Sequence, residues 1–499
     1  MPPNFLNDNL FSVYASSNKT FINTESQTYS FKEFDNLINK ISNLLISSGL
    51  NEDDRILVKL EKSVYSFAIY IACIRAGGIF IPINTDYTPS EIDYFIENSI
   101  PFLFISDDES LKEIQNKNLK TFSLNDDMSG TFIENIKMQK NSFVPVKRKK
   151  DDIASILYTS GTTGRSKGAM LSHDNLFSNT KELLKFWRFD DNDILLHALP
   201  IYHIHGLFVA CNICLISGAR IHFIKKFETE KVIEYLPKST VMMGVPTFYT
   251  RLLESKKLSA SVTKNIRVFI SGSAPLLSET HEKFEKVTGH KILERYGMTE
   301  TNMNSSNPYD GERRAGTVGF PLPNIKIRIT DTESKKKLGS EKIGMIEIKG
   351  DNIFQGYWKM KKQTGESFTN DGYFITGDLG KFSSDGYLSI IGRNKDLIIS
   401  GGLNIYPKEI EMVIDEINYV KETAIIGIPH MDFGEAVVAV IVADIGKVSE
   451  KTIMSTVQTK LAKFKHPKKI IFVPELPRNT MGKVQKQSLR SSYSKIFNQ

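Results

Sequence analysis

The chain has 499 residues, of which 40% are hydrophobic and 24% charged, and its formal net charge is +7 at pH 7. This length exceeds one ordinary hydrophobic core, and the composition excludes a disordered chain or one embedded in a membrane. The basic excess is spread along the chain and forms no aromatic-studded basic module, so small anionic ligands are favoured over nucleic acid as partners.

The cysteines and the N-terminal segment bear on the compartment. Cys211 and Cys214 have C-x-x-C spacing, but they lie in an apolar run without a second ligand pair, which favours buried thiols over a metal or redox site. The segment from Met1 to Asn9 lacks a signal-peptide pattern, and no apolar run reaches the roughly eighteen residues that a membrane span needs. We therefore expect a cytoplasmic monomer or homodimer without a membrane span.

The first two thirds of the chain alternate strands and helices. A capping box at Ser30–Glu33 begins a helix whose apolar spacing continues to Gly49. After it we expect a strand at 55–60, a helix at 63–76, a strand at 79–83, a helix from residue 90 and a strand at 102–105. Further strands are expected at 153–158, 169–171, 241–243, 268–271 and 292–294. This alternation predicts an α/β fold with parallel sheets.

The predicted secondary-structure pattern changes twice after residue 315. Short strands at 325–330, 345–349 and 387–391, separated by turn residues, predict an antiparallel, barrel-like β segment. From residue 410 to the C-terminus a helix–strand–strand–helix pattern predicts a small α+β domain. We expect a large N-terminal domain at residues 1–393 and a small, mobile C-terminal domain at 394–499.

A glycine-rich string, Tyr158-Thr-Ser-Gly-Thr-Thr-Gly-Arg-Ser-Lys-Gly168, lies between two predicted strands. Backbone N–H groups in such a loop can surround an anion, and Lys167 adds a positive charge. The spacing is not that of a Walker loop, and a flexible surface hairpin is the alternative for the loop alone. The full string resembles the phosphate-binding loop of the adenylate-forming enzymes, a superfamily of acyl-CoA synthetases, peptide-synthetase adenylation domains and luciferases.

Four further motifs follow in the order and spacing of that superfamily. They are Tyr296-Gly-Met-Thr-Glu300, Tyr373-Phe-Ile-Thr-Gly-Asp378, the segment from Gly392 to Gly402, and Pro477-Arg-Asn-Thr-Met-Gly-Lys483. Taken alone, Glu300 is equally typical of a carboxylate at a helix start, and Lys483 is more typical of a solvated charge. Together the five motifs extend the resemblance over nearly the whole chain.

The resemblance implies ATP, Mg²⁺ and coenzyme A as ligands. It implies that Tyr296 stacks on adenine, Thr299 touches the α-phosphate, Asp378 accepts hydrogen bonds from the ribose, and Glu300 with Thr162 holds the metal. These roles suit the residue types, because Mg²⁺ prefers hard oxygen ligands and a base needs a flat face. The other implied contacts of nucleotide or CoA are Thr159, Ser160, Gly161, Thr163, Gly164, Gly272, Ser273, Ala274, Glu294, Arg295, Gly297, Met298, Gly401 and Gly402.

The resemblance also implies how the reaction is catalysed. Lys167 and Mg²⁺ would offset the charge of the leaving pyrophosphate, and Lys483 would bridge the substrate carboxylate and the α-phosphate. Arg393 would bind the ribose, and Lys395 would be the pivot on which the small domain turns before thiol attack. His205, in Leu199-Pro-Ile-Tyr-His-Ile-His-Gly206, falls where the family places a gate to the acid pocket.

The identity of the acid needs its own argument, because the fold accepts many acids. Residues 241–253 predict a strand, a turn and a helix with Pro246 near the first helical position. Arg251 shares a helical face with Thr247 and Phe248, and a guanidinium there suits a substrate with a second carboxylate. A monocarboxylic acid would leave that charge buried and unpaired. The alternative is that Arg251 faces solvent.

Three segments resemble the malonyl-CoA synthetases in particular: residues 199–209, the Gly-Val-Pro-Thr-Phe-Tyr stretch and residues 299–313. We therefore expect malonate as the acid, with methylmalonate tolerated if there is room beside Met303. Ser271 and Arg313 are further candidate substrate contacts.

Three other functions stay open. A short-chain or aryl acyl-CoA synthetase would use the same five motifs without needing Arg251. A catalytically silent scaffold is disfavoured because the functional residues are retained together, namely Lys167, Glu300, Asp378, Arg393 and Lys483. A peptide-synthetase module is disfavoured because no carrier-domain pattern follows Lys483.

Overall fold

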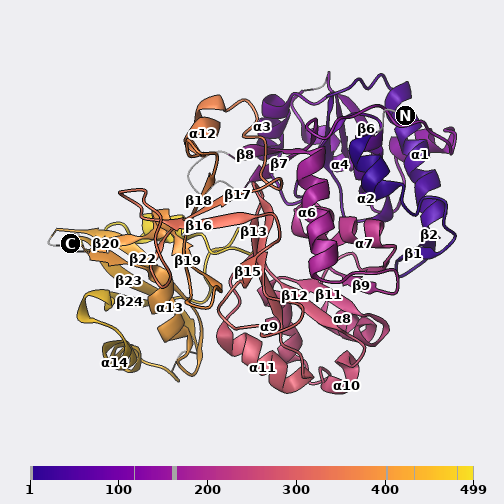
Figure 1. Ribbon diagram of the computed structural model, residues 1–499. Coiled ribbons are helices and arrows are strands. Elements are labelled where there is room, and N and C mark those ends of the chain that lie inside the picture. The colour runs from indigo at the N-terminus through magenta and orange to yellow at the C-terminus, as the bar shows by residue number, and fades with distance from the viewer. Residues whose placement is uncertain are drawn as a thin grey trace. The chain divides into compact units, whose positions relative to one another are not determined.

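The computed structural model describes residues 4–116, 118–159, 166–400, 403–431, 433–444, 446–479 and 482–497. The chain divides into two compact units, Met1–Lys326 with Lys349–Gly372, and Ile327–Ile348 with Tyr373–Gln499. Each unit has its own sheets (Figure 1). Each also has its own hydrophobic core.

The first unit contains a six-stranded sheet in the order β6-β5-β3-β4-β7-β8. The strands are β3 (Arg55–Lys59), β4 (Ile79–Pro82), β5 (Leu103–Ser106), β6 (Lys120–Ser123), β7 (Ile153–Thr159) and β8 (Lys167–Ser172). Neighbours pair in parallel except β7 and β8, which form an antiparallel pair flanking the glycine-rich string. Its helices include α1 (Phe31–Ser47), α2 (Val64–Arg75), α3 (Pro89–Ser99), α4 (Asp108–Glu113) and α5 (Thr131–Lys137). The predicted capping box at Ser30 and Glu33 is formed.

A nine-stranded sheet in the same unit has the order β15-β14-β13-β12-β11-β9-β10-β1-β2. Its strands are β1 (Thr20–Asn23), β2 (Thr28–Ser30), β9 (Ile194–His197), β10 (Arg220–Phe223), β11 (Val241–Gly244), β12 (Val268–Ser271), β13 (Leu293–Met298), β14 (Asn302–Ser306) and β15 (Phe320–Pro321). The run from β1 through β13 is parallel, so the carboxyl ends of β9, β11, β12 and β13 lie along one edge. Loops at that edge are where parallel sheets place ligands.

Helices cover the nine-stranded sheet and form its core with it. They include α6 (His173–Phe186), α7 (Asn212–Ser217), α8 (Thr229–Tyr235), α9 (Pro246–Glu254), α10 (Ala260–Thr263) and α11 (Ser278–Thr288), with α12 (Lys361–Glu366) elsewhere in the unit. Figure 1 shows α8, α9 and α11 beside β11 and β12, and one core cluster joins Val232, Tyr249, Phe269 and Phe284 from these elements. Burying such side chains contributes about 1.5–3 kcal/mol each.

The second unit contains two smaller sheets. Strands β16 (Lys326–Thr330), β17 (Gly344–Lys349), β18 (Phe374–Phe382) and β19 (Leu388–Arg393) form one, in that order. The other contains β20 (Ile398–Ser400), β21 (Leu403–Ile405), β22 (Val420–His430), β23 (Gly434–Ala443) and β24 (Lys469–Phe472). Helices α13 (Pro407–Asp415), α14 (Glu450–Lys460) and α15 (Lys486–Tyr493) belong to this unit. Apolar residues of α13, α14, β22 and β23 form its core.

The predicted fold class is confirmed, including the parallel sheets and the C-terminal helix–strand–strand–helix unit. The barrel-like segment is an open path of four strands in the part of the chain that the structure describes. The strand expected at 292–294 extends further, because β13 continues through Met298, and Glu300 lies in the turn before β14, which disagrees with the alternative of a helix start. The strand is longer because β14 pairs with it in antiparallel fashion.

The predicted division at residue 393 stays a prediction, because compactness does not show which segment moves. Cys73, Cys211 and Cys214 are free and buried, as expected. Among the described helices, none has the length and apolar character that crossing a membrane requires.

Candidate active site

Three polar side chains lie buried at the carboxyl edge of the nine-stranded sheet without hydrogen-bond partners for specific atoms. Ser271 ends β12, and its register partner Glu294 on β13 directly precedes Arg295. Among the described residues, Ser271 Oγ, His205 Nε2 and Arg295 Nε and Nη2 are buried and have no hydrogen-bond partner. Unpaired buried polar atoms are costly, so their gathering at a ligand-binding edge indicates a binding site for a polar group.

Of these three residues, Arg295 gives the clearest indication of an anion-binding site. Its exposed fraction is 3%, and no carboxylate forms an ion pair with it in the part of the chain that the structure describes. Burial lowers the pKa of Arg295 from its ordinary value to about 9. The guanidinium lies against Gly272, since a Cβ at that position would be 2.4 Å from Arg295 Cζ. A buried cation of this kind is suited to receive an anionic group of a ligand.

His205 lies near this cation at the start of the π-helical segment η2 (His205–Cys211). Its Nδ1 is 3.3 Å from Ser273 Oγ, and Ser273 has a φ of 73°, in the left-handed region that non-glycine residues seldom adopt. Burial and the charge of Arg295 lower the pKa of His205 well below its ordinary value. The neutral ring can therefore offer a hydrogen bond to a ligand without adding a second charge.

The other predicted acid contacts lie in different surroundings. Arg251 is exposed on α9, while Phe248 of the same helix stacks on Phe227 with ring centroids 4.0 Å apart. Arg313 donates to the carbonyl oxygens of Pro308, Lys291 and Tyr309, which occupy its guanidinium with main-chain contacts. Met303 is buried on β14 with an exposed fraction of 1%.

The glycine-rich string is described at its two ends, and Ser160 to Arg165 lie outside the described residues, including the predicted contacts Ser160, Gly161, Thr162, Thr163 and Gly164. Thr159 ends β7 and pairs with Lys167 at the start of β8. The ammonium of Lys167 lies 4.8 Å from the centroid of the Tyr357 ring.

Helix α3 supports both ends of the string. Tyr94 donates a hydrogen bond to the carbonyl oxygen of Ser166 at 2.7 Å, and Tyr158 donates to Asn98 Oδ1 at 2.7 Å. The carbonyl oxygen of Asn98 in turn accepts from Trp358 Nε1 at 3.1 Å.

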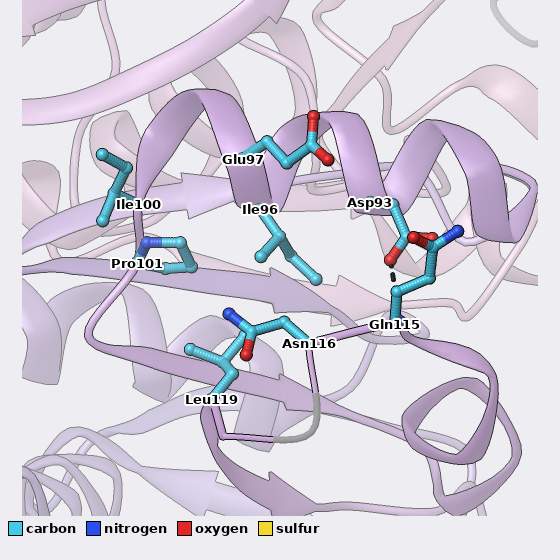
Figure 2. Close-up of a pocket in the computed structure, with 8 residues that line it drawn as sticks. All are labelled: Asp93, Ile96, Glu97, Ile100, Pro101, Gln115, Asn116 and Leu119. Carbon is cyan, nitrogen blue, oxygen red and sulfur yellow. Dashed lines mark hydrogen bonds between the residues drawn. The ribbon is translucent and has the colours of Figure 1, made fainter.

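The same helix also borders a cavity of about 200 Å³ (Figure 2). Asp93 and Glu97 line it together with Ile96 and Ile100, and the backbone N–H of Gln115 donates to Asp93 Oδ1 at 3.0 Å. None of the predicted site residues lines this cavity. It is therefore a surface feature apart from the candidate site.

Glu300 is buried in the turn between β13 and β14 with an exposed fraction of 7%. Tyr357 donates a hydrogen bond to Glu300 Oε1 at 2.9 Å, and the backbone N–H of Phe354 donates to the Glu300 carbonyl at 2.8 Å. Tyr296, Gly297, Met298 and Thr299 precede it and are partly exposed. The described residues contain no group of three or more His, Cys, Asp or Glu that could hold a metal by themselves. A single carboxylate fits Mg²⁺, which commonly takes its other ligands from phosphates and water.

The second unit carries the predicted ribose contacts. Asp378 on β18 is 7% exposed at its side chain, and its Oδ1 forms an ion pair with Arg393 Nε at 2.7 Å. Arg393 Nη1 also donates to the carbonyl of Thr376 at 3.2 Å. Lys395 follows in a short 3₁₀ turn, and burial lowers its pKa. Gly401 and Gly402 lie outside the described residues.

Lys483 belongs to the same unit, and hydrogen bonds link it and Gly482 to Asn479. The backbone N–H of Gly482 donates to the Asn479 carbonyl at 2.8 Å, and Gly482 has a φ of 74°, which glycine adopts without strain. The backbone N–H of Lys483 donates to Asn479 Oδ1 at 2.9 Å. Lys483 is exposed and lies shortly before the start of α15 at Lys486.

Comparison with known proteins identifies the class. A model of the AMP-binding enzyme family matches residues 12–358, and a model of the AMP-binding enzyme C-terminal domain matches residues 409–483. The chain therefore belongs to the AMP-binding enzyme family. Its predicted place in the adenylate-forming superfamily is confirmed.

Three individual relatives show which members of the family the chain is similar to. ATP-bound MatB from Rhodopseudomonas palustris is 48% identical, with a TM-score of 0.97 and 100% of both chains covered. The malonate–CoA ligase of Arabidopsis thaliana is 32% identical over 96% of this chain and 86% of its own length. A long-chain-fatty-acid–CoA ligase of Bacillus subtilis is 31% identical over 90% of this chain and 87% of its own. These two ligases are named for very different acids, so the acid that this chain accepts must be argued from its pocket.

Proposed function

We propose that this protein ligates malonate to coenzyme A, using ATP, through a malonyl-adenylate with release of AMP and pyrophosphate. The observation that carries the proposal is the buried guanidinium of Arg295, whose Nε and Nη2 lack partners among the described residues. The second carboxylate of malonate supplies the missing acceptors. The similarity to a malonate–CoA ligase over 96% of the chain supports the same substrate.

Arg295, Ser271 and His205 each contribute a different contact to that carboxylate. Arg295 provides charge and a pair of N–H donors, which match the two oxygens of a carboxylate. Ser271 Oγ and His205 Nε2 add hydrogen bonds from the neighbouring strand end and from η2. An acid with an alkyl chain or an aromatic ring at this place leaves the guanidinium unpaired and so binds less well. Methylmalonate is accepted to the extent that its methyl group fits beside Met303.

The reaction needs the other carboxylate to become an electrophile. That carboxylate attacks the α-phosphorus of ATP, the bond to pyrophosphate breaks, and the product is a mixed anhydride whose carbonyl the CoA thiolate then attacks. Lys167, held at the base of the glycine-rich string, offsets the charge of the leaving pyrophosphate. Asp378 and Arg393 bind the ribose, and Lys483 bridges the reacting carboxylate and the α-phosphate during the first step.

Mg²⁺, when bound, neutralises phosphate charge and polarises the oxygens that carry it. Glu300 is the residue that would hold it, because its carboxylate is a hard oxygen ligand fixed in place by Tyr357. Thr162, which lies outside the described residues, is the second metal contact that the resemblance implies.

A pyrophosphate-release assay across malonate, methylmalonate, propionate and benzoate tests the proposal directly. The expected order places malonate first in kcat/KM and the two monocarboxylic acids at least tenfold lower. The alternative, a short-chain or aryl acyl-CoA synthetase, predicts that propionate or benzoate exceeds malonate. That order would refute the proposal and leave the family assignment intact.

A further inference from the structure

Lys62 is a buried cation that none of the steps above uses. It lies between β3 and α2 with an exposed fraction of 8%. Its Nζ is 2.7 Å from His197 Nδ1, 2.8 Å from the carbonyl oxygen of His197 and 2.7 Å from that of Ile224. The ring centroid of Phe223 lies 4.3 Å from the same nitrogen. No carboxylate forms an ion pair with Lys62 within the described ranges, so these acceptors and the ring face are what hold the ammonium.

The hydrogen bonds of His197 fix the position of its proton. Its Nε2 lies 2.8 Å from the carbonyl oxygen of Gly206, and a carbonyl can only accept, so Nε2 must carry the hydrogen. Burial and the charge of Lys62 lower the pKa of His197 well below its ordinary value. The ring is therefore neutral, and its Nδ1 accepts a hydrogen bond from the amino group of Lys62, whose own pKa burial lowers well below its ordinary value. The thiol of Cys211 also donates to the Gly206 carbonyl, at 3.2 Å.

The Gly206 peptide is constrained from a second direction. A Cβ on Gly206 would lie 1.9 Å from the carbonyl oxygen of Pro200, so the backbone there passes closer to Pro200 than any side chain permits. Gly206 directly follows His205, and together they begin the π-helical segment η2. Such irregular helical turns are frequent at functional sites because they aim a side chain that a regular helix would turn elsewhere.

We propose that Lys62 and His197 are positioning residues for the acid pocket: through the Gly206 carbonyl they set the orientation of His205 beside Ser273. The chain of contacts runs from the ammonium of Lys62 to His197 Nδ1, from His197 Nε2 to Gly206, and from the adjoining His205 Nδ1 to Ser273 Oγ at 3.3 Å. Neither residue touches the substrate. The inference rests on the proposed function only in taking His205 as a contact of the bound acid.

The chain contains a matched control for the loss of a buried lysine. Lys59, on β3, has the same exposed fraction of 8%, and its Nζ donates to Ser110 Oγ at 2.7 Å. Its Nζ also lies 3.9 Å from the carboxylate oxygen Oδ2 of Asp107. These partners belong to the α4 region of the six-stranded sheet and not to the segment 197–206. Lys59→Met therefore removes a buried ammonium without disturbing the route to His205.

The kinetic test compares Lys62→Met, His197→Leu, His197→Gln and Lys59→Met in the full-length enzyme. Lys62→Met and His197→Leu should raise the KM for malonate about tenfold, the size of effect expected from losing one buried hydrogen bond, while the KM for ATP changes less than about twofold. His197→Gln keeps one donor and one acceptor and should restore the malonate KM to within about threefold of wild type. Lys59→Met should lower the Tm without changing the ratio of the two KM values.

A spectroscopic test needs no substrate. Long-range ¹⁵N–¹H NMR of the histidine-labelled protein, assigned by comparison with His197→Gln, should show His197 as the neutral tautomer with its proton on Nε2. Lys62→Met should leave the proton on Nε2, which still donates to the Gly206 carbonyl, and should shift the Nδ1 resonance because that nitrogen loses its hydrogen bond from Lys62.

Three outcomes overturn the inference: a wild-type His197 with its proton on Nδ1, equal increases in the KM values for malonate and ATP in Lys62→Met, or the same malonate effect in Lys59→Met. If the enzyme prefers an acid other than malonate, the same variants are measured with that acid. The proposed function then fails, while the positioning role is still decided by the ratio of the KM values.

Discussion

Replacing Arg295 by methionine removes the buried guanidinium but keeps a side chain of similar length. Burial lowers the pKa of Arg295 to about 9, and a change of that size corresponds to about 5 kcal/mol against the charged form at this buried position. A carboxylate that pairs with the guanidinium recovers part of this free energy, typically about 2–5 kcal/mol for a desolvated charge pair. Arg295→Met should therefore lower kcat/KM for malonate by some tens- to thousands-fold.

For the same reason, Arg295→Met should not lower the activity with propionate or the Tm of the ligand-free enzyme. Activity with propionate should hold or rise, because this acid has no second charge to leave unpaired. The Tm of the ligand-free enzyme should hold or rise as well, since a methionine there no longer carries the cost of burying an unpaired charge. Pyrophosphate release with both acids and a thermal melt without ligand measure these effects. Arg251→Met is the control for a cation on the exposed face of α9.

Two results would refute this reasoning. Wild-type malonate kinetics in Arg295→Met would show that the buried cation does not bind the acid. A steep loss of malonate activity in Arg251→Met, with Arg295→Met unchanged, would restore the original hypothesis that Arg251 holds the distal carboxylate.

The remaining predictions concern the nucleotide, the metal and the second unit. Lys483→Ala should abolish malonate-dependent ATP–pyrophosphate exchange yet spare thioester formation from supplied malonyl-adenylate, and equal loss of both in a folded variant would contradict its role. Glu300→Gln should raise the Mg²⁺ concentration needed for half-maximal rate, because the amide lacks the charge that a hard cation prefers. Asp378→Ala should weaken ATP binding at every Mg²⁺ concentration; rescue of this variant by Mg²⁺, with none for Glu300→Gln, would mean that the two roles are reversed. Lys395→Pro should slow the thiol step much more than adenylation, and an equal effect on both steps would argue against a pivot at this residue.

Much of the fold follows from local patterns in the sequence. The capping box at Ser30, the alternation of strands and helices, and Pro246 at the first turn of α9 each have a short-range physical cause, and each is found in the structure. The exception is the continuation of β13 through Met298. That extension depends on pairing with β14 after a turn at Thr299 and Glu300, and the sequence of β13 alone contains no signal for it.

The sequence predicts those site residues that belong to a recognisable motif. It predicts less well the residues whose role depends on whether their side chains are buried. A single cation in a helix, such as Arg251, and one in a strand, such as Arg295, look alike in a sequence, because neither carries a mark of its exposure. The resemblance implied a nucleotide contact for Arg295, whereas the structure adds that it is 3% exposed with unpaired donor atoms. The only sequence signal was its position at the end of a parallel strand beside Ser271 and Glu294.

Gly272 connects the binding of the nucleotide with the binding of the acid. It belongs to the loop expected to border the adenine, and any side chain there would enter the space of the Arg295 guanidinium, 2.4 Å from a Cβ. A methyl group at this single position would require the guanidinium, the far end of a flexible side chain, to shift away from it. A substitution in the loop expected to border the adenine would therefore also change the position of the cation proposed to bind the acid. Conversely, drift in that loop is restricted for as long as a dicarboxylic acid is the substrate.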